Sequence, residues 1–169
     1  WKRYAAEGSW FYEVREAGYK YNLTDIAAAL GRVQLERLHE MCRARAAIAG
    51  RYTAALAGME DLEGLQPWQG VEHAWHLYPL RLNLDALTID RAGFIEELRA
   101  RNIGASVHFI PLHRQPFYAD KYGYLLRDFP VAEAEYPRLI SLPIYSRMTG
   151  DDVESVIAAV VEIAHAFRR

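Results

Sequence analysis

Two pairs of histidines carry the residue types that could bind a metal ion or act on a substrate. His73 and His76 form H-x-x-H at a predicted loop-to-strand junction, and His108 and His113 flank FIPL just after a predicted strand. Zinc needs three or four converging ligands, and no Cys, Asp or Glu follows the first pair at ligand spacing, so we predict no metal site. The second pair is a functional candidate because α/β proteins collect functional groups beyond strand ends. A hydrogen-bonded structural histidine fits the same pattern.

A second candidate is the segment GYKYNLTD, in which Lys20 and Asn22 stand immediately before a predicted helix. A cation and an amide beside a helix N-terminus, whose free N–H groups carry partial positive charge, form a corner that can bind phosphate. An ordinary turn followed by a helix cap explains the same residues, and Asn22 alone would suffice as the cap. Both interpretations stay open at this point.

Motifs of several common enzyme classes do not occur in the sequence. It contains no G-x-S-x-G, no P-loop and no G-x-G-x-x-G. Nucleophile-elbow hydrolases and dinucleotide-binding folds therefore receive no support. Lysine is also scarce, since only Lys2, Lys20 and Lys121 could serve as amine nucleophiles.

A long amphipathic helix is predicted to follow the Lys20 segment. Residues 1–22 are rich in aromatic residues and glycine without a sustained period, which is typical of a loop-rich segment. Over residues 23–58 apolar side chains recur every three to five positions, as on one face of a helix. Asn22 or Thr24 can cap its start, and Gly58 can end it in the left-handed conformation.

The remaining residues, 59–169, predict a small α/β domain. The alternation in AWHLYPLRLNL places His76 on one sheet face, and Pro79 suits an edge or a bulge because it cannot donate to a ladder. Thr149 fits the N-cap of a last helix. The predicted fold class is α/β (α+β), with a small sheet of three or four strands covered by helices on one face. Strands are predicted near residues 74–84, 105–109 and 140–145.

Composition and charge exclude several kinds of protein. The 169 residues carry 20 Lys+Arg against 22 Asp+Glu, a formal charge of -2. Binding to nucleic acid or to an anionic membrane needs a basic excess, so we expect neither partner. The single cysteine, Cys42, excludes a disulfide framework and fits a reducing compartment, for which we expect the cytoplasm.

Four segments, in order and with compatible spacing, resemble the C-terminal half of the DegT/DnrJ/EryC1/StrS aminotransferases. The resemblance spans nearly the whole chain and is nearest to members that aminate the C4 ketone of UDP-linked sugars. The segments are GYKYNLTDIAAALGRVQLERL at 18–38, AWHLYPLRL at 74–82, RNIGASVHFIPLHRQPFY at 101–118 and FPVAEAEYPRLISLPIYSRMTGDDVESVIAAV at 129–160.

This resemblance implies an aspartate-aminotransferase-like (fold type I) pyridoxal 5'-phosphate enzyme. Such an enzyme moves an amino group from an amino acid, by family habit glutamate, to a nucleotide-linked 4-keto sugar in polysaccharide or glycan biosynthesis. It works as a homodimer with shared active sites. The resemblance also implies that residues 1–22 end the large cofactor domain, 23–58 form the connecting helix and 59–169 form the small C-terminal domain.

The resemblance assigns roles to three residues. Lys20 and Asn22 match the segment that reaches across the dimer to the cofactor phosphate, where many members carry Asn and Arg. His108 matches the histidine that approaches the cofactor and the sugar from the small domain. The Schiff-base lysine, in an S-x-x-x-K motif, and the carboxylate near the pyridine nitrogen are expected upstream of Trp1. No catalytic residue is therefore expected within this chain, which we expect to be an inactive C-terminal piece of the enzyme.

Two other hypotheses remain open. One is a pyridoxamine-phosphate-dependent sugar dehydrase or a DegT-like regulator on the same fold. The residue at the upstream cofactor position, Lys or His, would distinguish this hypothesis from an aminotransferase. The other is a non-catalytic dimerisation or interaction module. Without the large domain the long helix would expose apolar surface and favour self-association.

Overall fold

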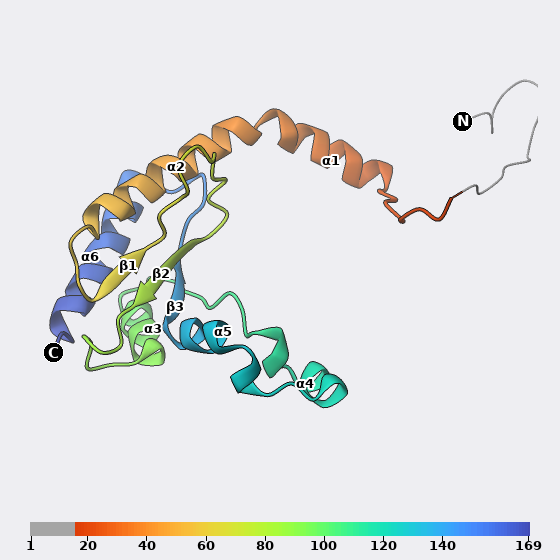
Figure 1. Ribbon diagram of the computed structural model, residues 1–169. Helices are drawn as coiled ribbons and strands as arrows, with labels where there is room; N and C mark the ends of the chain where they lie inside the picture. Colours follow the sequence, from red (N-terminus) through yellow and green to blue (C-terminus); the bar gives the residue numbers. More distant parts are fainter. Residues whose placement is uncertain (1–15) are drawn as a thin grey trace, which may run out of the picture. The chain divides into compact units, whose positions relative to one another are not determined.

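The computed structural model of the chain describes residues 16–169 (Figure 1). Its contacts divide the chain into two units, Trp1–Glu36 and Arg37–Arg169, and each is described by itself. The helices and strands are α1 (Asp25–Glu36), α2 (Leu38–Ala55), β1 (Leu62–Gly64), β2 (Tyr78–Leu82), α3 (Arg91–Ala100), α4 (Pro116–Tyr122), α5 (Pro130–Glu135), β3 (Leu139–Leu142) and α6 (Gly150–Ala166), with 3-10 turns at Leu112–Arg114, Leu126–Asp128 and Tyr136–Arg138.

The described part of the first unit consists of a short extended segment and helix α1. Thr24 caps the helix, because its Oγ1 accepts a hydrogen bond from the backbone N–H of Ala27 at 3.3 Å. Of the two predicted caps the structure therefore uses Thr24 and not Asn22. Within this described segment no residue of α1 is buried, and its large apolar side chains are exposed. These side chains are Ile26, Leu30, Val33 and Leu35.

The single helix predicted over residues 23–58 is described as two helices, α1 and α2, with Arg37 between them. Arg37 has φ -97° and ψ -1°, and a ψ near zero departs from helical geometry enough to interrupt the regular pattern. Gly58 follows α2 with φ +81°, the left-handed conformation predicted for it. Residues 1–15 of the predicted loop-rich segment lie outside the described residues, and the proposed division into domains stays a prediction.

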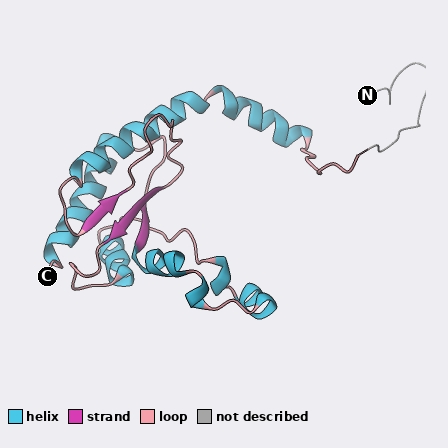
Figure 2. Ribbon diagram, viewed as in Figure 1, coloured by secondary structure: helices cyan, strands magenta, loops and turns pink. Residues whose placement is uncertain are grey.

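The three strands form one antiparallel sheet in the order β1-β2-β3 (Figure 2). Strand β2 is central, so the prediction that Pro79 places it at an edge is wrong for the strand as a whole. The register explains how proline is tolerated there. Strand β1 ends where Gly64 pairs with Leu80, so at Pro79 only β3 lies alongside, with Ser141 opposite.

The hydrophobic core lies between one face of this sheet and three helices. Alternate side chains of β2 are fully buried, as period-two patterning requires. Helix α6 contacts both α2 and α3, and α3 contacts β3. The predicted mixed α/β fold is confirmed. Core residues include Tyr52 of α2, Tyr78, Leu80 and Leu82 of β2, Phe94 and Leu98 of α3, Ile140 of β3, and Val153, Val160 and Ile163 of α6.

A capping box starts helix α6, as predicted from Thr149. Its hydroxyl accepts from the backbone N–H of Asp152 at 3.1 Å, and the Asp152 carboxylate accepts from the Thr149 N–H at 2.7 Å. These hydrogen bonds lower the pKa of the Asp152 carboxyl group. None of the helices within residues 16–169 has the length and hydropathy that crossing a membrane requires.

Three local predictions need correction. Residues 105–109 do not form a strand, because only Ser106 pairs, through one antiparallel bridge to Ser141. His76 precedes β2 and is exposed, so it does not lie on the sheet face. Strand β1 was not predicted, since three residues are too few to show a period of two.

A buried charge ties the last residues of the chain to the start of the sheet. Asp61, directly before β1, is completely buried. Its Oδ1 is 2.8 Å from Nη2 of Arg168, and its Oδ2 is 3.3 Å from Nε of the same guanidinium. Close by, the N–H of Thr88 donates to the Phe167 carbonyl at 2.7 Å. This bidentate ion pair neutralises a carboxylate that would otherwise be buried without a counter-charge.

Candidate functional site

The candidate site is built around His108, which strand β3 holds through a buried serine. Ile140 and Leu142 point into the core, so Ser141 between them faces the other side of the sheet. There its Oγ lies 2.9 Å from Nδ1 of His108. The backbones of Ser106 and Ser141 exchange two hydrogen bonds, at 2.7 and 3.2 Å, which fix the chain two residues before the histidine. His108 itself is exposed, so a small buried group orients an accessible imidazole.

A shallow cavity of about 170 Å³ adjoins the imidazole. Most of its lining is apolar, and one carboxylate contributes to it. A concave apolar surface with a few polar groups beside it is the usual form of a small-molecule site. The lining residues are Val107, His108, Phe109, Pro111, Ala132, Glu135, Tyr136 and Leu139.

The second predicted histidine, His113, is a structural anchor. It is 7% exposed, its Nε2 lies 2.7 Å from Oε1 of Glu133, and its ring stacks on Phe129 with centroids 4.3 Å apart. Arg114 also binds the Glu133 carboxylate, through Nε at 2.7 Å and through Nη2. The alternative of a hydrogen-bonded structural histidine therefore describes His113. His108 differs from it in being exposed and next to the cavity.

The segment 108–113 is thus held at both ends, by Ser141 at one end and by Glu133 at the other. We call it the anchored loop. Between its ends Phe109, Ile110 and Leu112 are 76%, 49% and 64% exposed. The loop therefore presents apolar side chains to its surroundings without depending on them for its attachment.

Glu133 should make the stability of the chain depend on acidity. The Arg114 guanidinium and then the His113 ring lower its pKa to about 2, from an ordinary value of 4.5. Because the folded pKa lies below the unfolded one, the stabilisation is complete above pH 4.5 and is lost as the pH falls toward 2. In Glu133→Gln we expect this part of the pH dependence to disappear, as measured by urea unfolding from pH 6 to about 2.

Glu154→Gln is the matched control, because it also removes a carboxylate that pairs with an arginine, Arg51. The Glu154 side chain is 67% exposed, so its ion pair should contribute little to stability. An unchanged pH profile in Glu133→Gln, or an equal change in Glu154→Gln, would contradict the assignment.

Lys20 and Asn22 belong to the first unit and His108 to the second. The surroundings of each residue are therefore described within its own unit. Both residues of the first unit are exposed and precede the Thr24 cap. Lys20 stands between Tyr19 and Tyr21, whose rings are 5.8 Å apart. Since Thr24 serves as the cap, Asn22 is not needed for that role. An ammonium and an amide of this kind suit the oxygens of a phosphate group.

Among the lysines within residues 16–169, Lys121 has a different environment. Its Nζ lies 5.2 Å from the ring centroid of Phe117 and 5.4 Å from that of Tyr122. A protonated ammonium is favoured over aromatic faces. Lys121 also lies outside an S-x-x-x-K motif, because Phe117 occupies the position four residues before it.

The H-x-x-H pair is split between two environments. His73 Nδ1 accepts from the backbone N–H of Trp75 at 3.0 Å, whereas His76 is exposed. In the part of the chain that the structure describes, no group of three His, Cys, Asp or Glu side chains is arranged to hold a metal ion.

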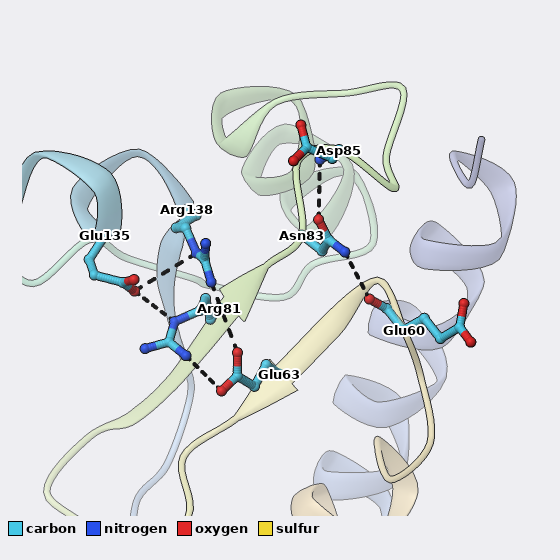
Figure 3. Close-up of polar contacts among 7 residues, drawn as sticks. All are labelled: Glu60, Glu63, Arg81, Asn83, Asp85, Glu135 and Arg138. Carbon is cyan, nitrogen blue, oxygen red and sulfur yellow. Dashed lines mark hydrogen bonds and ion pairs between the residues drawn. The ribbon is translucent and has the colours of Figure 1, made fainter. Parts of the chain in front are cut away.

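Charged side chains on the sheet face opposite α2, α3 and α6 form a charge-compensated cluster (Figure 3). Arg81 of β2 binds Glu63 of β1 and Glu135 of α5, each at 2.6 Å, and Arg138 lies 3.9 and 3.8 Å from the same two carboxylates. Two positive and two negative groups alternate, so the cluster joins α5 to the sheet without creating an excess charge for a ligand.

Sequence reasoning missed Ser141 and Glu133, the residues that hold the two histidines. The available signal for Ser141 was a lone polar residue inside the apolar run LISLPI. A polar side chain that alternates with buried ones should face the other side of a strand. Glu133 gave no such signal, because its partners lie 19 and 20 residues away in a segment without a regular period.

Comparison with known proteins gives a consistent result over nearly the whole chain. The sequence profile of the DegT/DnrJ/EryC1/StrS aminotransferase family matches residues 2–161. The uncharacterized protein MJ1066 of Methanocaldococcus jannaschii is 53% identical over 163 residues. The spore coat polysaccharide biosynthesis protein SpsC of Bacillus subtilis is 45% identical over 164 residues. Each alignment covers 96% of this chain but only 42% of the relative.

Solved structures agree with the sequence comparison. The sugar aminotransferase Spr1654 of Streptococcus pneumoniae, in its PLP form, matches with a TM-score of 0.81 and 31% identity. The match covers 94% of this chain and 40% of that one. Spr1654 has also been solved in a PMP form, with the same TM-score. The chain thus corresponds to about two fifths of the length of these proteins.

Proposed function

The chain belongs to the DegT/DnrJ/EryC1/StrS aminotransferase family, and from this premise we propose that it is the C-terminal part of a pyridoxal-phosphate-dependent sugar aminotransferase. The observation that carries the proposal within the structure is the exposed His108 imidazole, fixed by Ser141 beside a shallow cavity. An oriented, accessible hydrogen-bonding group next to an apolar surface suits a sugar ring, which has both hydroxyl groups and apolar faces.

The proposed reaction is the transfer of an amino group to a sugar. An amino group passes from an amino acid, with glutamate as the expected donor, to a nucleotide-linked 4-keto sugar destined for a cell-surface polysaccharide or glycan. The name of SpsC, a spore coat polysaccharide biosynthesis protein, supports that destination. The reaction would take place in the cytoplasm and within a homodimer whose subunits share active sites.

The roles of this chain's residues follow from their chemistry. Lys20 and Asn22 would hold the cofactor phosphate with a cation and an amide. His108 would contact the sugar. When bound, pyridoxal phosphate supplies an electron sink for the reacting carbon. The lysine that binds it covalently would come from the remaining three fifths of a protein as long as the relatives, because none of Lys2, Lys20 and Lys121 stands, within this sequence, in the S-x-x-x-K motif that the family implies.

This proposal predicts a difference between the 169-residue chain and the complete protein that contains it. The complete protein with pyridoxal phosphate should convert glutamate and a UDP-linked 4-keto hexose to a UDP-linked amino sugar, detected by mass spectrometry. The 169-residue chain should give no product and no absorbance band from a lysine-bound cofactor.

Two outcomes would decide against the proposal. One is a cofactor band in the short chain that borohydride fixes onto one of its own lysines, Lys2, Lys20 or Lys121. The other is a product of the complete protein that has lost a hydroxyl group and gained no nitrogen, which would support the dehydrase instead. The complete protein with its cofactor-binding lysine replaced by alanine serves as the control.

A further inference from the structure

The hydrogen bond between Ser141 and His108 has a direction that the surroundings of the serine define. A hydroxyl group has one proton to donate, and a neutral imidazole has one donor nitrogen and one acceptor nitrogen. Ser141 is 7% exposed, so its hydroxyl proton has little access to water. Within residues 16–169, its Oγ has Nδ1 of His108 as its hydrogen-bond partner, at 2.9 Å.

A buried hydroxyl proton without an acceptor is costly, whereas a hydroxyl oxygen tolerates an unused lone pair more easily. The serine therefore donates and Nδ1 of the neutral imidazole accepts. Because Nδ1 then carries no proton, the imidazole proton is on Nε2. Nε2 is the ring nitrogen that Ser141 does not hold, and His108 is exposed beside the cavity.

We propose that Ser141 is a positioning residue that fixes neutral His108 as an Nε2–H hydrogen-bond donor toward an oxygen atom of the sugar substrate. This inference rests on the proposed function for the identity of the ligand, but the state of the histidine belongs to the chain itself. The oxygen would be a hydroxyl, carbonyl or phosphate oxygen, since each can accept an N–H bond. His108 in this form presents a proton and no lone pair, so it orients or polarises an oxygen and does not remove a proton.

The rigidity of the support strengthens this assignment. Ser141 belongs to β3, whose neighbours Ile140 and Leu142 are buried in the core. The Ser106–Ser141 bridge holds the chain just before His108, and the Glu133 anchor holds His113 five residues later. A donor fixed on rigid supports can bond to a substrate without first losing conformational freedom.

The test is nitrogen-15 NMR of the labelled 169-residue chain, at a pH above the titration of its histidines. We expect His108 to show a protonated Nε2 and an unprotonated Nδ1, together with a slowly exchanging Ser141 hydroxyl proton. In Ser141→Ala the hydroxyl signal is lost, the Nδ1–H form becomes detectable and the His108 side chain becomes more mobile. Ser141→Thr, which keeps the hydroxyl group, should restore the parental pattern.

Ser106→Ala is the matched control, because Ser106 takes part in the same bridge through its backbone while its own side chain is exposed. It should leave the His108 signals unchanged. A protonated Nδ1 in the parent chain would overturn the proposal even if Ser141→Ala did not fold, and so would identical His108 signals in the parent chain and a folded Ser141→Ala. These spectra need neither cofactor nor substrate, so a failed transamination assay would leave this inference standing.

Discussion

Replacing Arg168 with alanine is expected to lower the free energy of unfolding by about 2–3 kcal/mol, the largest stability effect we expect from a single charged side chain here. The substitution leaves the Asp61 carboxylate completely buried without the guanidinium that neutralises it. Removing one partner of a buried pair costs about 3–5 kcal/mol, and we place the loss lower because the Arg168 side chain is 46% exposed. Urea unfolding of the chain, followed by tryptophan fluorescence, measures the change.

Arg169→Ala is the neighbouring control, since Arg169 donates to the Leu87 carbonyl at 2.8 Å and has no buried charge to neutralise. Its loss should cost about 1 kcal/mol. In the double variant of Arg168→Ala with Asp61→Asn, much of the loss should be recovered, because the carboxylate charge is then gone. Equal effects of Arg168→Ala and Arg169→Ala would show that the buried pair contributes nothing beyond an ordinary hydrogen bond.

His108→Ala in the complete protein is expected to lower kcat/KM for amino transfer by about a hundredfold, while the free energy of unfolding falls by about 1–3 kcal/mol, the cost of leaving the buried Ser141 hydroxyl without its acceptor. This expectation takes the acceptor of the His108 hydrogen bond to be the keto oxygen of the sugar, since removing one oriented donor from a reacting oxygen costs about 10²–10³ in rate. The imidazole itself is exposed, so its removal opens no cavity in the core and the stability loss is limited to this hydrogen bond and the contact with the Phe109 ring. Steady-state kinetics and thermal unfolding of the same preparation separate the two effects.

His165→Ala provides the matched histidine control, because His165 lies in the last turn of α6 with an exposed side chain. Its kcat/KM should equal that of the parent protein. Unchanged amino transfer in a folded His108→Ala variant would remove His108 from the site, and a large loss of stability would make it a structural residue.

The sequence was most informative where local rules decide the structure. Thr149 occupies the N-cap position that its hydroxyl favours, and Gly58, two residues beyond the C-cap Leu56, has the positive φ that the lack of a side chain favours. Tyr78, Leu80 and Leu82 are buried in alternation, as their spacing predicts. Such features depend on a few neighbouring residues, so a single sequence is enough to identify them.

Features that depend on partners distant in the chain could not be predicted in this way. The central position of β2 depends on β1, whose three residues carry no periodic signal. His108 was identified as a candidate, but Ser141, its support, lies 33 residues further on. Likewise, sequence alone left His113 undecided between function and structure, and its buried contact with Glu133 favours structure. Pairings of this kind emerge only when tertiary contacts are known.

Within the six residues of the anchored loop, the two ends and the middle differ in how strongly the fold restricts substitution. Its ends, His108 and His113, are fixed by bonds to Ser141 and Glu133, so mutations there disturb orientation or folding. Between these ends Phe109, Ile110 and Leu112 are exposed and contribute little to the fold. The residues of this stretch can therefore be replaced without removing the bonds that hold the histidine. For the same reason it is the natural region to randomise when a library is built to change the accepted sugar.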